Sequence, residues 1–385
     1  MQVIRAQQVF DGERFLGPGD VVLDGPTIVA VNPPTEYAEG VLVEDLGDVT
    51  VLPGLVDAHQ HLTWDCSFDA VGWHERHDDE ALLQRGLVNA RQALAAGVTT
   101  ARDLGGRGRA PFDLRDECSR NPTAGPTLQV AGPALTTPGG HCWFLGGQCE
   151  GAEDLALAVS RLDEAGVDVI KVMATGGNIT PGSAPHESQF GLTELRVVVE
   201  AAHAAGLPVA AHAHGTQGVA DALDAGVDTI EHCSFMTADG VAEDPTLVRR
   251  LATSGIAVSI TGGAVPGPLP PAIAARMPTL NAHGRGLLDA SVRCIIATDA
   301  GIGPAKPHDL LPHTIEYAVE ELGATVEVAL AMGTARAAEA IGLGGRVGRL
   351  RPGAAADLLA VSGRVDHDVS AMRHPVRVVH GGVTV

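Results

Sequence analysis

The pattern that decides the fold is written out in residues 208–234, PVAAHAHGTQGVADALDAGVDTIEHCS. An apolar, strand-like run, Pro208–His214, is followed by Thr216–Ala225, which is rich in alanine and has helical spacing. Gly226 then ends the helix, since a helix C-terminus favours a residue that tolerates a positive φ. A second apolar run, Asp228–Ser234, follows at once. Short apolar strands separated by a helix are typical of a parallel sheet buried on both faces.

This strand–helix unit recurs along the chain. Eight apolar, β-branched runs are expected as strands: Leu55–His61, Val98–Leu104, Thr127–Ala131, Val167–Ala174, Pro208–His214, Asp228–Ser234, Ile256–Thr261 and Arg293–Asp299. Most are separated by stretches with helical spacing, each followed by a glycine: Asp79–Ala96, Ala152–Ala165, Thr193–Ala205, Thr216–Ala225 and Asp244–Ser254. Eight such strands alternating with helices predict an α/β fold, a (β/α)8 barrel of the TIM type.

The two ends of the chain differ from the middle. Residues 1–52 and 346–385 hold short β-like runs separated by turn residues, and neither end alone can cover a sheet. We therefore expect both ends to meet in one small β-sandwich domain, with residues 53–345 inserted between them as the barrel. A length of 385 residues suits one large domain with a small one attached.

Composition argues against several functional classes. With 47 acidic and 26 basic residues the formal net charge is −21, which disfavours nucleic-acid backbones and anionic membrane surfaces. No apolar run approaches the roughly 20 residues that cross a bilayer, and no secretion signal is visible at the start. The six cysteines lack CxxC spacing, so we expect reduced thiols. These features predict a cytoplasmic protein whose partner is a small molecule.

Polar residues interrupt or end the apolar strands, where a barrel places its active site. They are His59, His61, Lys171, His212, His214, His232 and Asp299. His59 and His61 share one side of their strand, because side chains alternate along it. Alone, this pair is readily explained as two hydrogen-bonded core histidines. With further histidines and a carboxylate converging on the barrel mouth, a bound metal ion is the better explanation.

Lys171 lies in the apolar run DVIKVMA, residues 168–174. A lysine in such a run is paired, neutral or chemically modified. One interpretation is a salt bridge inside the barrel. An ammonium that faced two metal ions would be repelled, however, whereas carboxylation by CO2 turns the positive group into a negative one with two oxygens that can bridge the ions. If the histidines bind metal, we therefore expect a carboxylated Lys171.

Several stretches become distinctive when taken together. They are Leu52–His61 (LPGLVDAHQH), the Lys171 strand, Ala211–Gly215 (AHAHG), Ile230–His232 (IEH), Thr298–Ala300 (TDA) and, near the end, Pro352–Leu358 (PGAAADL). In this combination the whole chain resembles the amidohydrolase superfamily. It is most similar to the prolidase-like branch, which includes Xaa-Pro and Xaa-Arg dipeptidases, zinc carboxypeptidases and ochratoxinase.

The resemblance implies two divalent metal ions, with zinc expected, although the same nitrogen and oxygen ligands also accept manganese, cobalt or iron. The implied ligands are His59, His61 and Asp299 for the more buried ion and His212 and His232 for the more exposed one, with carboxylated Lys171 bridging the two. His214 shares a strand face with His212, so either imidazole can be the ligand. The resemblance favours His212 and leaves His214 to contact the substrate.

The resemblance also implies the catalytic groups and the reaction. Asp299 would take a proton from the attacking water and deliver it to the departing amine. His141, in the loop TPGGH at 137–141, matches a histidine that steadies the substrate carbonyl or carboxylate; a solvated loop histidine is the alternative. The implied reaction cleaves an amide or peptide bond and releases a C-terminal amino acid from a dipeptide or an N-acyl amino acid, specialised metabolites included.

The substrate contacts stay open at this point. A free carboxylate needs a cationic partner, and the candidates are Arg107, Arg109, His141, Arg276 and Lys306. Trp64, Phe68, Trp73 and Phe144 follow the first and third strands and form either an apolar pocket or a packed lid. The long segments 62–78, 176–191 and 262–278 are expected as irregular loops around the pocket. A homo-oligomer is compatible with the resemblance.

Two other functions compete with this one. A deaminase or cyclic-amide hydrolase of the same superfamily would use one metal ion and generally a glutamate near the fifth strand, where this chain has AHAHG, and it would not need Lys171. A non-catalytic assembly protein on the same barrel would be expected to have lost ligands, whereas all six expected positions are filled. The number of bound metal ions separates the three.

Overall fold

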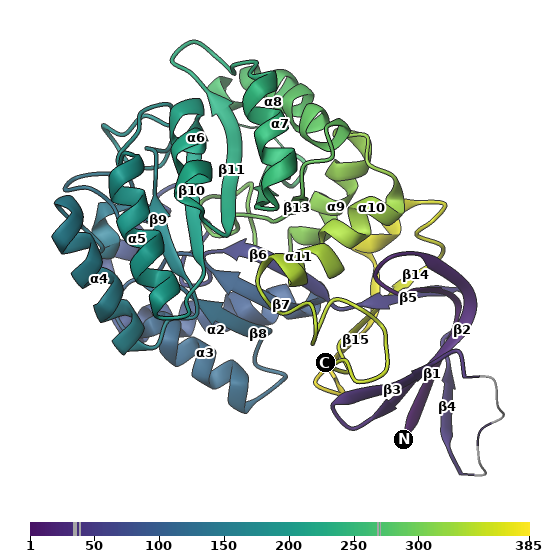
Figure 1. Ribbon diagram of the computed structural model, residues 1–385. Coiled ribbons are helices and arrows are strands. Elements are labelled where there is room, and N and C mark those ends of the chain that lie inside the picture. Colours follow the sequence, from purple (N-terminus) through teal and green to yellow (C-terminus); the bar gives the residue numbers. More distant parts are fainter. Residues whose placement is uncertain (34–36, 38–39, 268, 270) are drawn as a thin grey trace.

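The two ends of the chain share one sheet in the computed structural model, which describes residues 1–33, 37, 40–267, 269 and 271–385 (Figure 1). Its strands are β1 (Gln2–Phe10), β2 (Phe15–Asp24), β3 (Thr27–Val31), β4 (Leu42–Asp45), β5 (Val49–Pro53), β14 (Leu358–Ser362), β15 (Pro375–His380) and β16 (Val383–Thr384). The order is β16-β15-β14-β5-β1-β2-β3, and β4 also pairs with β1. Strands from the first and last parts of the sequence therefore lie side by side.

Strand β1 is the point at which this sheet branches. Residues 2–5 pair in parallel with β4, whereas Gln8 and Val9 pair in parallel with Thr50 and Val51 of β5. The register of β1 against β2 also shifts between Ala6 and Val9, as at a β-bulge. In place of the two separately bonded sheets of a sandwich, the hydrogen bonds thus form one branched sheet, because one strand changes partner along its length.

The middle of the chain forms two parallel sheets. The first holds β6 (Leu55–Gln60), β7 (Val98–Asp103) and β8 (Thr127–Val130); the second holds β9 (Ile170–Met173), β10 (Val209–Gly215), β11 (Thr229–Met236), β12 (Ala257–Ile260) and β13 (Cys294–Ile296). All of their pairings are parallel. Each of the eight runs expected as a strand overlaps one of these strands, and six contain theirs entirely, so the mixed α/β fold with parallel sheets is confirmed.

Single parallel bridges join the edges of the two sheets. Gln60, at the end of β6, is bridged to Ala300, which follows β13, and Leu135, which follows β8, is bridged to Val172 of β9. Backbone hydrogen bonds accompany them, from the His61 amide to the Ala300 carbonyl at 2.9 Å and from the Leu135 amide to the Lys171 carbonyl at 2.8 Å. The strand ends that carry the predicted site residues are thereby held next to one another.

Helices connect the strands and pack against them. They are α1 (Ala70–Arg76), α2 (Asp79–Ala95), α3 (Ala110–Arg120), η1 (Trp143–Leu145), α4 (Gly151–Ala165), α5 (Leu192–Ala204), α6 (Thr216–Ala225), α7 (Pro245–Ser254), α8 (Pro271–Asp289), α9 (Leu311–Glu320), α10 (Val326–Met332), α11 (Ala335–Ala340) and η2 (Val369–Arg373). All five expected helices are present. Gly166, Gly226 and Gly255 end α4, α6 and α7 in the left-handed conformation, with φ of 80°, 81° and 78°.

Two of the three segments expected as irregular loops contain helices. Helix α1 lies within 62–78, and α8 begins at Pro271 and continues through Pro278. A proline in the first turn costs no hydrogen bond, because that amide has no partner within the helix. Pro278 gives up one backbone donor, and the helix continues for eleven residues beyond it to Asp289. The expectation of irregular loops is therefore wrong for 70–76 and for 271–278, and the prolines of the second segment are compatible with a helix.

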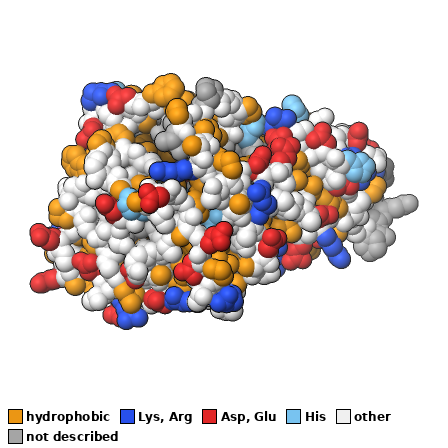
Figure 2. All heavy atoms as spheres, turned by 90° about the horizontal axis from the view of Figure 1, so that it is seen from above, with side chains coloured by type: hydrophobic (Ala, Val, Ile, Leu, Met, Phe, Trp, Pro, Cys, Tyr) orange, Lys and Arg blue, Asp and Glu red, His pale blue; other side chains and the backbone are white. Residues whose placement is uncertain are grey.

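The described residues contain no helix that is both long enough and apolar enough to span a membrane. On the face shown in Figure 2, acidic and basic side chains are interspersed among apolar ones. Although the net charge is −21, the acidic side chains on that face do not form one continuous acidic patch.

Candidate metal centre

Two groups of side chains that can hold metal ions meet where the parallel strands end. The first cluster is His59, His61 and Asp299, and the second cluster is His212, His214 and His232. Within each cluster one nitrogen or oxygen atom per residue lies within 4.8 Å of the others. The clusters are neighbours, since the rings of His59 and His232 are 5.2 Å apart. The structure therefore brings together six of the seven predicted strand-end residues in these clusters.

Asp299 joins the two histidines of the first cluster. Its Oδ1 lies 3.1 Å from Nε2 of His61 and 3.4 Å from Nε2 of His59. Burial acts to raise the pKa of Asp299, but the neighbouring His59 and His61 outweigh burial and hold the pKa well below its ordinary value. Asp299 is thus a carboxylate at neutral pH, which is the form that can bind a metal ion or accept a proton.

Each histidine of the second cluster has one ring nitrogen tied to a neighbour. The bonds run from Nε2 of His212 to the Gly176 carbonyl (2.9 Å), from Nδ1 of His214 to Ser234 Oγ (2.7 Å) and from Nδ1 of His232 to Thr261 Oγ1 (2.7 Å). Burial lowers the pKa of His212 and of His232 well below the ordinary value. Neutral imidazole is the form that binds metal. His212 and His214 both lie in the cluster, so the choice between them stays open.

Lys171 is the seventh predicted residue, and its amine has no partner. It lies on β9 and is 1% exposed, and among the described residues its Nζ makes no hydrogen bond, to a carboxylate or to anything else. Burial lowers the pKa of this amine to about 8. The positive charge of Lys171 acts on both clusters. Together with burial, it lowers the pKa of His59 in the first cluster and of His212 in the second. An isolated buried ammonium is costly, so this amine fits a site where a further group completes it.

Two of these residues hold a strained backbone. His232 has a φ of 71° and Asp299 a φ of 56°, in the left-handed region that favours glycine. Such a conformation persists only where the surroundings enforce it, and it is concentrated at functional sites. The strain supports a functional role for the ends of β11 and of the segment after β13.

His141 lies beside the second cluster and is not a solvated loop residue. It is 4% exposed, and its ring centre is 4.8 Å from that of His212. Burial lowers the pKa of His141 to about 3. The alternative considered from the sequence, an imidazole in solvent, is therefore wrong.

Comparison with known proteins identifies the type of chain that carries this centre. The sequence profile of the Amidohydrolase family matches residues 50–385. The chain belongs to the amidohydrolase family. It is a hydrolase that acts on C–N bonds, and members of this family generally use divalent metal ions.

This amidohydrolase has relatives in the predicted branch. It is 27% identical to ochratoxinase of Aspergillus niger, over 86% of this chain and 74% of that protein, and 27% identical to imidazolonepropionase of Chloroflexus aggregans, over 89% and 84%. It is also similar to a solved Xaa-Pro dipeptidase with methionine bound in its active site. That structure is 26% identical, has a TM-score of 0.88, and is matched over 100% of this chain and 99% of its own. The prolidase-like resemblance is confirmed.

The amidohydrolase contains a buried ion pair beneath the first cluster that sequence reasoning missed. Nδ1 of His59 donates to Glu231 at 2.9 Å, and Arg102 donates to the other oxygen of Glu231 at 2.9 Å. Arg102 and Glu231 are 1% and 0% exposed. Since His59 donates from Nδ1, its Nε2 keeps a free lone pair on the side of Asp299. The signal was present in the sequence, because Arg102 and Glu231 are charges inside apolar strands.

Most basic candidates for a substrate carboxylate are already engaged. Lys306 donates to the carbonyls of Thr261 and Thr298, the latter at 2.9 Å, Arg107 donates to the His77 carbonyl, and Arg109 pairs with Asp113 at 3.3 Å. Arg276 lies on α8.

The aromatic residues are divided. Trp64 and Phe144 are buried together with ring centres 5.7 Å apart, whereas Trp73 stacks on His77 and Phe68 is 98% exposed. Trp64 and Phe144 thus pack against each other, and the choice between an apolar pocket and a lid stays open.

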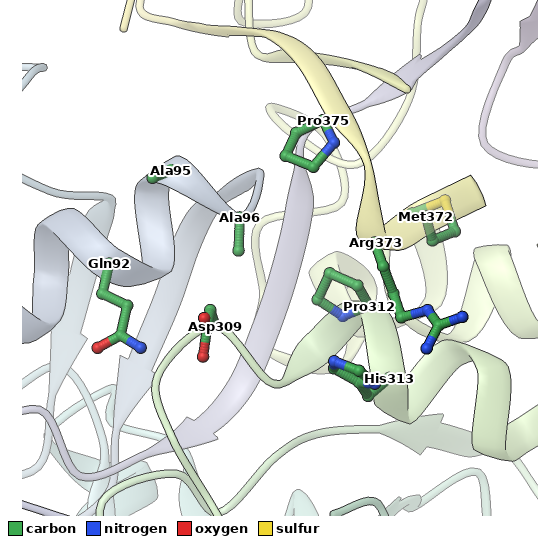
Figure 3. A pocket seen from close by; sticks show the side chains of 9 residues that line it. All are labelled: Gln92, Ala95, Ala96, Asp309, Pro312, His313, Met372, Arg373 and Pro375. Atoms are coloured by element: carbon green, nitrogen blue, oxygen red, sulfur yellow. The ribbon is translucent and has the colours of Figure 1, made fainter. Parts of the chain in front are cut away.

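The structure also has a pocket of about 250 Å³, whose lining residues are shown in Figure 3. It is bounded by α2, α9 and the segment from η2 into β15, and Gln92, Asp309, His313 and Arg373 supply its polar lining. His313 and Arg373 both approach Glu316, at 3.9 and 3.4 Å. None of the predicted site residues lines this pocket.

Proposed function

We propose that this amidohydrolase uses two metal ions to cleave an amide or peptide bond and release a C-terminal amino acid from a dipeptide or an N-acyl amino acid. The observation that carries the proposal is the unpartnered, buried amine of Lys171 next to two facing ligand clusters. A centre for one ion would use only one of the two clusters or would not need Lys171, whereas a centre for two ions uses both clusters and the lysine. The substrate class follows the similarity to ochratoxinase and to the Xaa-Pro dipeptidase structure.

We infer that the eight parallel strands close into a (β/α)8 barrel. The two bridges, Gln60 to Ala300 and Leu135 to Val172, support closure because they join both pairs of free sheet edges. For the division of the chain, we infer a terminal unit of residues 1–52 and 346–385 around a barrel of residues 53–345. The pairing of β5 with β14 supports it, since both belong to the sheet built from the two chain ends.

The donor set fits two divalent ions, with zinc as the expected metal. His59, His61 and Asp299 would hold one, His232 with His212 or His214 the other, and carboxylated Lys171 would lie between them. When bound, such ions make a water molecule more acidic and polarise the substrate carbonyl. A carboxylated Lys171 would also remove the cost of the isolated amine, because its new oxygens have positive partners.

The chain's own residues supply the proton transfers and the orientation. Asp299, ionised and next to both histidines of the first cluster, accepts the proton of the attacking water and passes it to the amine that leaves. His141, beside the second cluster, and His214, within it, would donate to the carbonyl oxygen as it becomes negative; their rings lie 4.8 and 4.7 Å from that of His212, which supports this role. The products are a free carboxylic acid and a free amino acid.

Metal analysis tests the proposal. The purified protein is expected to hold about two metal equivalents, and Lys171→Ala to hold no more than about one, because the bridging ligand is lost. The chain has only two lysines, Lys171 and Lys306, so protein prepared with ¹³C-bicarbonate is expected to give one carbamate carbon signal that Lys171→Ala removes. Met173→Leu, on the same strand, is the control and should change neither result. One equivalent that is indifferent to Lys171 would indicate a mononuclear deaminase or cyclic-amide hydrolase, and none a non-catalytic protein.

The open choice between two histidines has its own test. We expect His212→Asn to lose about one metal equivalent, whereas His214→Asn keeps the metal and loses turnover by about 10²-fold or more, as for removal of one donor to the substrate oxygen. Metal content and kcat measured on the same samples decide the matter. The reverse pattern would make His214 the ligand and His212 the substrate contact.

A further inference from the structure

Two residues of the loop 176–191, which follows Lys171, form hydrogen bonds at His141; they are Thr180 and Gln189. Thr180 Oγ1 lies 3.1 Å from Nδ1 of His141 and accepts a hydrogen bond from the amide of Cys142 at 2.9 Å. Gln189 Oε1 accepts from the amide of His141 at 2.8 Å. Thr180 is 3% exposed, so water does not readily replace these contacts. Ring and backbone of His141 are therefore both set by one loop.

The hydrogen bonds of Thr180 determine which nitrogen of His141 carries the proton. A hydroxyl has one hydrogen to donate and two lone pairs. One lone pair is used by the Cys142 amide, and the hydrogen needs an acceptor. Nδ1 of His141 is the nitrogen acceptor beside this hydroxyl, whereas the sulfur of Cys142, which also contacts Thr180, is only a weak acceptor. If Nδ1 carried the proton instead, the buried hydroxyl hydrogen would be left with the weak sulfur acceptor alone, which disfavours that tautomer.

The neutral ring must then carry its hydrogen on Nε2, on the side away from Thr180. A Cβ atom on Gly177 would lie 2.2 Å from this nitrogen, so only glycine leaves room for it there. The ring is also next to His212 of the second cluster, with 4.8 Å between ring centres. Nε2 is thus a hydrogen-bond donor at the edge of the candidate metal centre.

Gln189 fixes the backbone of His141, whereas Thr180 contacts its ring. Its amide nitrogen donates to Thr136 Oγ1 at 2.6 Å and to Thr137 Oγ1 at 3.2 Å, while its oxygen accepts from the His141 backbone. All of its hydrogen-bonding groups are used, so the side chain cannot turn over without losing bonds. The backbone that carries His141 is therefore fixed relative to the loop that carries Thr180.

We propose that Thr180 is a positioning residue that keeps His141 in the Nε2–H form, so that this N–H donates to the carbonyl oxygen of the amide substrate as negative charge develops there. The inference rests on the proposed function and deepens it. It makes loop 176–191 part of the catalytic apparatus, where the sequence alone indicated a pocket wall.

Kinetics of four variants test the role of Thr180. We expect Thr180→Val, which keeps the shape and loses the hydroxyl, to lower kcat by at least about 10-fold with little change in KM, and Thr180→Ser to keep kcat within about 3-fold. In the His141→Asn background, Thr180→Val should cause no further loss. Metal content should equal that of the wild type, because Thr180 contacts neither cluster. An unchanged kcat in Thr180→Val, or the same loss in both backgrounds, would overturn the proposal.

A measurement without substrate separates this inference from the proposed function. In protein labelled with ¹⁵N-histidine, His141 is identified by the signals that His141→Asn removes. We expect its Nδ1 to be unprotonated and its Nε2 protonated in the wild type and in Thr180→Ser, and this preference to be lost in Thr180→Val. If that pattern is found but no dipeptide or N-acyl amino acid is hydrolysed, the proposed function fails and the role of Thr180 in setting the tautomer stands. A proton on Nδ1 in an active enzyme would overturn the inference alone.

Discussion

Asp299→Asn is expected to lower the turnover of an amide substrate by about 10²–10⁴-fold, which is the range for loss of one proton-transfer group. Asparagine has the size of aspartate but no basic oxygen, so it accepts no proton from the attacking water and returns none to the amine. The fold should survive, because the backbone amide of Asp299 still donates to the His59 carbonyl at 2.8 Å. We expect an unchanged circular dichroism spectrum and a normal cooperative thermal transition.

Two leaving groups distinguish proton delivery from a general loss of activity. An N-acyl amino acid releases a basic amine, whereas the matching N-acyl aminobenzoate releases a weakly basic aniline that needs less help. If Asp299 protonates the amine, Asp299→Asn should lose more kcat on the first substrate than on the second. Metal content is measured on the same samples, because Asp299 is also an expected ligand. Wild-type turnover in this variant would remove Asp299 from the mechanism.

Asp103→Asn is the matched control for Asp299→Asn. Asp103 is also buried, but its oxygens accept from the backbone amides of Leu62 and Gly105, at 2.8 and 3.1 Å. Loss of this carboxylate is expected to lower the melting temperature and to have only a small effect on kcat. An equally large loss of turnover in Asp103→Asn would show that any buried carboxylate in this region has the same effect.

The sequence was most informative where a local pattern and a general rule of the fold act together. His59, His212, His232 and Asp299 stand at or near the end of an apolar run, and Lys171 interrupts one. In a parallel sheet with helical connections, these ends meet at one edge. Five side chains from distant parts of the chain could therefore be assigned to one site without knowledge of any contact.

What the sequence did not predict depends on contacts between segments that no local pattern connects. Arg102 and Glu231 are 129 positions apart, and Thr180 and His141 are 39 apart. Arg102 and Glu231 stand out as charges inside apolar strands, but neither stretch of sequence indicates that the two form a pair, and Thr180 is an ordinary loop residue. Only the pairing of strands and the packing of two loops gives them a role. For α8, the local pattern is misleading, because proline usually marks a loop or the end of a helix, whereas this helix begins at Pro271 and continues through Pro278.

Glu231→Gln is the second variant with a large expected effect, and it acts on stability and on metal binding through different atoms. Glu231 neutralises Arg102 inside the protein, and both are almost fully buried. Removing one partner of such a pair leaves an uncompensated charge and typically costs about 3–5 kcal/mol. We expect the free energy of unfolding of the metal-free protein, measured in denaturant, to fall by that order. Glu117→Gln breaks an exposed pair with Arg120 and is expected to leave the unfolding free energy unchanged.

The metal affinity of Glu231→Gln should fall for a separate reason. Arg102 and Thr229 both donate to one oxygen of Glu231, at 2.9 and 2.7 Å, so the glutamine oxygen will take that place and turn its NH2 group toward Nδ1 of His59. Nδ1 must then accept, which moves the ring hydrogen to Nε2, the nitrogen that faces Asp299. With its hydrogen on Nε2, His59 no longer offers a lone pair to the metal ion. We expect the metal affinity, measured by competition with a chelator, to fall by about 10–100-fold. Adding Arg102→Met removes the unpaired charge, so the double variant should recover stability but not metal affinity. Recovery of both would mean that the carboxylate serves the ion pair alone.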